Sequence, residues 1–217
     1  MYNITLICTT HKDIGNCNSE ELYKIIYYHN PEIIFEELRP TIYDECYTFN
    51  SFGIPERTTL ESKAITMYLQ THDLKHIAVV STDEDENLDT KFNSMNAYQS
   101  WRNIISEIEF LERCHGFSFI NSPECEQLFE DIKTLEKKVL ESSGNESLSQ
   151  IFLLADKGVN DYEDGIIKNI YQYSEANKYD TALMFIGAAH RKSIIQKIQE
   201  YDKASKLKLN WTLYNKV

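Results

Sequence analysis

The sequence is poor in the residues that interrupt helices and strands. Among its 217 residues there are only 7 glycines and 4 prolines, and these two residue types are the strongest markers of turns and chain breaks. We therefore expect long regular elements, and helices in particular. Hydrophobic residues make up 42% of the chain and aromatic residues 12%, which is ordinary for a folded domain and excludes a disordered chain.

Positive charge is also scarce. The 22 lysines and arginines stand against 34 aspartates and glutamates, which gives a formal net charge of -12. Binding to the phosphate backbone of a nucleic acid needs a concentrated positive surface. We therefore expect no nucleic-acid partner.

Long apolar runs and paired cysteine motifs are missing as well. The apolar runs are far shorter than the roughly 20 residues that a membrane-spanning helix needs. The N-terminus, MYNITLICTTHKD, lacks the basic start and the cleavage site of a signal peptide. The five cysteines include no CxxC pair, and reduced thiols are their simplest interpretation. We expect a cytoplasmic protein with no membrane partner.

Strands and helices are predicted to alternate in the first part of the chain. Apolar runs predict strands, and periodic apolar residues predict helices. The strands are expected over residues 3–10, 32–38 and 75–86, and the helices over residues 18–29 and 58–74. This alternating order predicts a parallel sheet with helices across its faces. Residues 39–57 are predicted to be a long connection that forms a lid.

The middle of the chain is predicted to be a helical insertion at about 94–142. Residues 93–114 and 122–142 carry apolar residues at helical spacing and are expected to pair as a helical hairpin. The elements expected after a loop at SSGNES are a helix at about 161–178, the strand TALMFIG, a helix over 192–202 and an alternating strand over 206–215. We expect one α/β domain over residues 1–217, whose C-terminal edge strand is available for pairing in a homodimer.

Histidines and acidic residues stand where the predicted strands end. They are His11, Glu36 with Glu37, Asp83 and His190. In open α/β sheets ligands bind beyond the carboxyl ends of parallel strands, so we expect these side chains to gather in one cleft. Glu36 and Glu37 cannot both face it, because consecutive strand residues point to opposite sides of a sheet.

The chemistry of this set is that of a reaction centre. An imidazole oriented by a carboxylate is a general base near neutral pH, and two imidazoles with a carboxylate form a common metal triad. We expect His11, Glu37 and His190 either to bind a divalent metal (Mn, Co or Zn) or to act as base and electrophile around an attacking water. The expected substrate or supporting contacts are Glu36, Arg39, Asp83 and Arg191.

Other ligand-binding motifs give weaker signals. The sequence has no GxGxxG, P-loop or GxSxG motif, which removes the motif support for nucleotide binding and for serine hydrolases of that type. His72 and His76 have the spacing of two metal ligands on one helix face, but the residues between them are predicted to form a turn. A single histidine after a strand is more often structural than catalytic, so the prediction depends on the pair His11 and His190.

Three short motifs resemble those of the TraB and Tiki proteins, with ChaN-like and erythromycin-esterase-like proteins as more distant relatives. They are CTTH ending in His11, PEIIFEEL with Glu37, and GAAH ending in His190. Asp83 is the nearest equivalent of an aspartate that recurs after the third strand of the group. Cys8 stands where glycine is usual, and the arginine often found on the helix before the last strand is not evident in NDYEDGIIKNI.

The resemblance implies a TraB/ChaN-like α/β fold and a hydrolase acting on a small-molecule or peptide substrate. Tiki proteins are metal-dependent proteases, thought to use manganese or cobalt, and erythromycin esterases hydrolyse a lactone with a histidine base. ChaN-like proteins bind haem, which implies the alternative of a non-catalytic protein that holds haem or another small ligand. A third interpretation is an assembly subunit whose paired histidines are structural.

Overall fold

A parallel five-stranded sheet forms the centre of the protein. The computed structural model describes residues 2–49, 51, 53–81 and 86–215. Its strands are β1 (Asn3–Thr9), β2 (Ile33–Glu36), β3 (Lys75–Ala78), β4 (Thr181–Gly187) and β5 (Asn210–Leu213). All neighbouring strands pair in parallel, in the order β3-β2-β4-β1-β5. The parallel sheet expected from the alternation of elements is confirmed, and so is the edge position of the C-terminal strand.

Strand β4 lies between β1 and β2, although it comes much later in the sequence. Phe185 of β4 pairs with Ile7 of β1, and Met184 of β4 pairs with Phe35 of β2. These four side chains are completely buried. Strands covered on both faces are apolar throughout, which explains the unbroken apolar runs. This order places the carboxyl ends of β1, β4 and β2 side by side.

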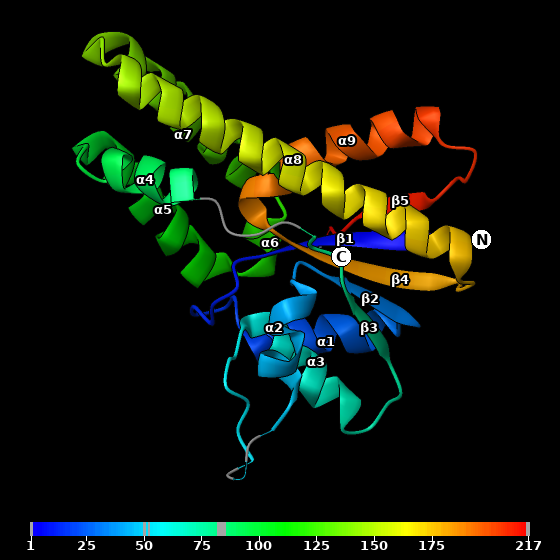
Figure 1. The fold of residues 1–217 in the computed structure, drawn as a ribbon. Helices are drawn as coiled ribbons and strands as arrows, with labels where there is room; N and C mark the ends of the chain where they lie inside the picture. The colour runs from blue at the N-terminus through cyan, green and yellow to red at the C-terminus, as the bar shows by residue number, and fades with distance from the viewer. Residues whose placement is uncertain (1, 50, 52, 82–85, 216–217) are drawn as a thin grey trace.

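Helices cover both faces of the sheet (Figure 1). The helices that the structure describes are α1 (Ser19–His29), α2 (Pro40–Tyr47), α3 (Leu60–Leu69), α4 (Glu86–Met95), α5 (Gln99–His115), α6 (Phe117–Ile120), α7 (Pro123–Ser143), α8 (Glu146–Ala176) and α9 (Arg191–Ala204). Helices α1, α2 and α3 lie below the sheet in Figure 1, whereas α8 and α9 lie above it. The N-cap of α1 is Asn18, whose side chain accepts a hydrogen bond from the Glu21 N–H.

The helical insertion projects from the sheet as an arm (Figure 1). Helices α5 and α7 pack against each other, as expected for a helical hairpin. The arm also contains α4 and the first half of α8. Lys91 links three helices of the arm, because its Nζ, which α4 carries, lies 2.9 Å from Glu136 of α7 and 2.6 Å from Asp156 of α8.

Several predicted boundaries were wrong. The strand predicted over 75–86 ends at Ala78, and Glu86 is the first residue of α4. The strand predicted over 206–215 is limited to Asn210–Leu213. Helix α8 begins at Glu146 and not near residue 161, since Asn145 caps it immediately after Gly144. The exposed Leu153 and Leu154 blur the apolar periodicity of its first half. The connection predicted over 39–57 contains α2, which begins with Pro40 at the first helical position, where proline is well tolerated. None of the helices in the described ranges is long and apolar enough to cross a membrane.

Candidate active site

Two histidines face one carboxylate at the carboxyl edge of the sheet. His11, Glu37 and His190 follow the ends of β1, β2 and β4. The Nε2 atom of His11 lies 3.4 Å from Oε2 of Glu37, and the Nε2 atom of His190 lies 3.6 Å from Oε1 of the same residue. The strand order therefore brings these three predicted residues together.

The second nitrogen of each imidazole contacts a glutamate on a helix. His11 Nδ1 lies 2.8 Å from Oε1 of Glu61 in α3, and His190 Nδ1 lies 2.8 Å from Oε1 of Glu163 in α8. Both glutamates are buried. His11, Glu37, Glu61, Glu163 and His190 are called the histidine–glutamate cluster below.

Glu37 is held between the histidines by two further hydrogen bonds. The backbone N–H of Gly187 donates to its Oε2, and the Tyr162 hydroxyl donates to its Oε1 at 2.7 Å. A Cβ atom at position 187 would lie 3.2 Å from His11 Nε2 and 3.4 Å from Glu37 Oε2. Such contacts are tight, so the glycine of GAAH provides the space in which the imidazole and the carboxylate meet.

The loop that carries His11 is fixed to α3. His11 has a φ of 61°, which few residues other than glycine adopt without support. Its carbonyl oxygen accepts a hydrogen bond from Leu60 N–H at 3.3 Å. Asp13 accepts from the Ser19 N–H at 2.7 Å and from Lys63 at 2.5 Å. These bonds hold His11 beside the helix that supplies Glu61.

The charges of the cluster shift the pKa values of its members. Burial lowers the pKa of His11, but hydrogen bonds to Glu37 and Glu61 outweigh it and raise that pKa from 6.5 to about 11. Burial likewise opposes protonation of His190, whereas Glu163 and Glu37 raise its pKa. Burial would raise the pKa of Glu37, but His11 and His190 lower it. Both imidazoles therefore hold protons readily.

Solvent reaches the imidazoles but not the carboxylate between them. The side chain of His11 is 44% exposed and that of His190 is 21% exposed, whereas Glu37 is 6% exposed. The two imidazoles are therefore more accessible to solvent than the carboxylate that their Nε2 atoms face.

The structure does not bring all the predicted supporting residues to the cluster. Glu36 points away from it, with Oε1 2.6 Å from Nδ1 of His76 and Oε2 accepting from Tyr47. Of the two consecutive glutamates, Glu37 is therefore the one that faces the histidines. Arg191 is buried and its guanidinium pairs with Glu126.

The remaining two predicted supporting residues are Arg39 and Asp83. Arg39 stands at the N-cap position of α2 and makes no side-chain capping hydrogen bond there. Burial raises the pKa of Tyr162, and the charge of Arg39 opposes this increase. Asp83 lies outside the described residues.

The expected divalent metal stays a prediction. Within residues 2–49, 51, 53–81 and 86–215, no three histidine, cysteine, aspartate or glutamate side chains are arranged to hold a metal ion. The two imidazoles face different oxygens of Glu37, so the donors do not meet at one point. His72 stacks on Tyr68, while His76 is a residue of β3, so these two histidines do not form a helical ligand pair.

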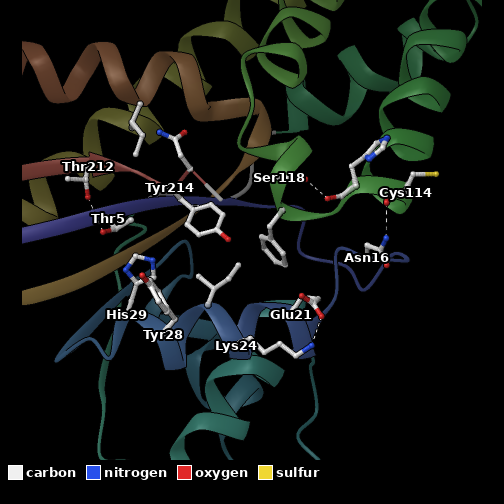
Figure 2. Close-up of a pocket in the computed structure, with 15 residues that line it drawn as sticks. Thr5, Asn16, Glu21, Lys24, Tyr28, His29, Cys114, Ser118, Thr212 and Tyr214 are labelled. Carbon is white, nitrogen blue, oxygen red and sulfur yellow. Dashed lines mark hydrogen bonds and ion pairs between the residues drawn. The ribbon is translucent and has the colours of Figure 1, made fainter. Parts of the chain in front are cut away.

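A groove of about 920 Å³ lies apart from the cluster, between α1, α6 and β5 (Figure 2). Tyr214 points into this groove, and Thr5 and Thr212 bond to each other at 3.0 Å on its floor. The Lys24–Glu21 ion pair, at 2.6 Å, lies along α1 at its edge. None of the residues that line the groove belongs to the histidine–glutamate cluster.

Sequence reasoning missed Glu61, Glu163 and Tyr162. The available signal for Glu61 was its place in the first turn of α3, three and four residues before the apolar Ala64 and Ile65. Glu163 and Tyr162 stand in a polar stretch of α8 that resembles any solvated helix turn. Comparison with family models, with curated proteins and with solved structures finds no match, so the TraB and Tiki resemblance remains a prediction from the three motifs.

Proposed function

We propose that the protein is a hydrolase whose reaction centre is the histidine–glutamate cluster. One observation carries the proposal: the Nε2 atoms of His11 and His190 face the same buried carboxylate, while each Nδ1 is held by a separate glutamate. An imidazole that a carboxylate orients is suited to proton transfer.

The proposed reaction divides the work between the two imidazoles. The neutral imidazole accepts a proton from water as the water oxygen attacks an acyl carbon. The charged imidazole polarises the carbonyl oxygen and then gives its proton to the leaving group. Glu37 stays ionised between them and stabilises the charged ring. The substrates we propose are small esters, lactones or peptides, because water attack on an acyl carbon is common to all three.

We infer a cytoplasmic location for this activity. All five cysteines are unpaired, and four of them are buried. Unpaired thiols in this number are typical of a reducing compartment.

The proposal is tested by assaying the purified protein on ester, lactone and peptide panels. His190→Ala and His11→Ala are each expected to lower kcat by about 10²- to 10⁴-fold, the usual contribution of a general acid or base. The matched control is His76→Ala, which removes a histidine that pairs with Glu36 outside the cluster. Equal loss in the control, or full activity in both cluster variants, would refute the proposal.

The same protein can be used to test for a divalent metal. The donors available to such an ion are the Nε2 atoms of His11 and His190 and the carboxylate of Glu37, although they are not arranged as a metal site. A rise in melting temperature with Mn²⁺, Co²⁺ or Zn²⁺ that His190→Ala abolishes would show binding at the cluster. Activity that survives EDTA would support the metal-free reaction.

A second candidate function is binding of haem or another small ligand without turnover. The groove of Figure 2 favours it, since about 920 Å³ is within the range of small-molecule sites. Titration with haemin, followed by absorbance, tests this candidate. Loss of binding in His29→Ala but not in His190→Ala would place the ligand in the groove, whose lining includes His29.

A further inference from the structure

Each of the two helical glutamates of the cluster contacts one histidine and does not contact Glu37. Their function is therefore a separate question. Glu61 reaches only His11 within the cluster, and Glu163 reaches only His190. Burying a carboxylate is costly unless it is paired, and replacement of a buried ion pair by apolar residues is often neutral or stabilising. Stability is therefore a weak reason for two such pairs.

The geometry of the two imidazoles gives a stronger reason for the presence of Glu61 and Glu163. Each imidazole has two nitrogens, and the glutamate at 2.8 Å from Nδ1 leaves only Nε2 for other partners. In both rings this remaining nitrogen faces Glu37. A ring rotated about its Cβ–Cγ bond would lose the contact with its glutamate and turn Nε2 away from Glu37.

The Glu61–His11 and Glu163–His190 pairs come from separate parts of the chain, yet in both the imidazole directs its Nε2 atom toward Glu37. Glu61 stands in the first turn of α3, whereas Glu163 stands in the middle of α8. Ser193 of α9 donates a hydrogen bond to the second oxygen of Glu163, which fixes that carboxylate in turn. Tyr162, the neighbour of Glu163, donates to Glu37. Helix α8 thus orients both the imidazole and the central carboxylate.

We propose that Glu61 and Glu163 are positioning residues, each of which fixes one imidazole with its Nε2 toward Glu37. This inference rests on the proposed function, because it assigns the two glutamates a part in the same reaction. Loss of a carboxylate that orients a metal-binding histidine typically costs about 10- to 100-fold in activity or metal affinity, and we expect an effect of similar size for these imidazoles.

The chain contains a matched control for this proposal. Glu36 and His76 form another buried carboxylate–imidazole pair, at 2.6 Å, immediately beside Glu37 in the sequence. Its imidazole contacts the Tyr43 hydroxyl and no second carboxylate that the structure describes. Replacing Glu36 therefore removes a pair of the same chemistry without touching the cluster.

The experiment compares Glu163→Gln, Glu163→Leu, Glu61→Gln and Glu36→Gln in the full chain. Glutamine keeps an acceptor oxygen but loses the charge, while leucine has a similar size and no acceptor. We expect kcat to fall about 10- to 100-fold in Glu163→Gln and Glu61→Gln, and further in Glu163→Leu, with a smaller change in KM. Glu36→Gln is expected to leave kcat close to that of the parent, because Glu36 contacts His76 and Tyr47 and no member of the cluster.

A second readout does not need turnover. Ring ¹⁵N spectra of the histidines report which nitrogen carries a hydrogen-bonded proton. The Nδ1–H signal of His190 is expected to move in both Glu163 variants and to stay unchanged in Glu36→Gln. Unchanged His190 spectra in Glu163→Leu, or an equal loss of kcat in Glu36→Gln, would overturn the positioning role. If the parent hydrolyses nothing but the spectra move as expected, the proposed function fails while the ring orientation by Glu163 stands.

Discussion

The backbone N–H of Gly187 donates a hydrogen bond to Glu37 at the point where β4 ends. Gly187 has an extended backbone with φ of -56° and ψ of 138°, so its conformation does not require glycine. The requirement is space, because a Cβ atom would lie 3.2 Å from His11 Nε2. The motif GAAH thus shapes the cluster with its first residue as well as its last.

Gly187→Ala is expected to lower kcat about tenfold, because displacing catalytic groups by a fraction of an ångström weakens proton transfer. The melting temperature should change little, since the reduced entropy of the unfolded chain offsets the crowding. Steady-state kinetics and thermal unfolding check both parts. Gly165→Ala, on α8 near Ser81, is the control; a comparable loss of kcat there would contradict the explanation.

The stability of the protein should fall as the pH rises above neutrality. The pKa of His11 is raised from 6.5 to about 11 in the folded state, so its stabilising contribution is complete below pH 6.5 and is lost as the pH rises through about 11. The lowered pKa values of Glu37 and Glu61 act in the opposite sense, because their contributions are complete above pH 4.5 and are lost on acidification.

Thermal unfolding across pH 4 to 11 measures this dependence. We expect the cluster to stabilise the folded state most between pH 4.5 and 6.5. In His11→Gln the melting temperature is expected to fall less steeply as the pH rises above this range. An alkaline decline that is identical in the variant would mean that other groups are responsible.

Hydrolysis should have an alkaline optimum. The pKa values of His11 and His190 are both raised above 6.5, so each imidazole loses its proton at a higher pH than usual, and the reaction needs one of them to be neutral. Activity is therefore expected to increase above pH 6.5 and to decrease again as the remaining proton is lost near pH 11. A kcat/KM profile measures both limbs. A maximum at acidic pH would be incompatible with a neutral imidazole as base.

Tyr162→Phe removes the hydroxyl that donates to Glu37 at 2.7 Å and keeps the ring against His190, where the ring centroids are 5.5 Å apart. A hydrogen bond to a charged group contributes about 1.5–3 kcal/mol, so we expect a loss of stability in this range. Denaturant unfolding measures it. A neutral result would mean that another donor replaces the hydroxyl at Glu37.

Asn121 joins α6 to the strand that leads to His11. Its side chain accepts from the Cys8 N–H at 2.8 Å and donates to the carbonyl oxygens of Cys8 and Phe117. Asn121→Ala leaves buried backbone groups without partners, which costs about 1–3 kcal/mol for each group. Chemical denaturation is expected to show this loss; an unchanged midpoint would indicate that water replaces the amide.

Much of the architecture could be predicted because local patterns encode it. The apolar runs of β1, β2 and β4 were long enough to identify buried strands, and the alternation with helices predicted parallel pairing. The start of α8 and the short helix α2 were missed, since the exposed Leu153 and Leu154 weaken one pattern and eight residues give little periodicity in the other.

The sequence alone determined that His11, Glu37 and His190 stand at strand ends, because strand boundaries are local properties of the chain. Only the tertiary structure decided which glutamate faces the histidines and which partners hold them. Glu61 and Glu163 are ordinary helical glutamates in the sequence, and their contacts with the imidazoles depend on how α3 and α8 pack against the sheet. Such packing is set by the burial of distant apolar side chains, which no short motif records.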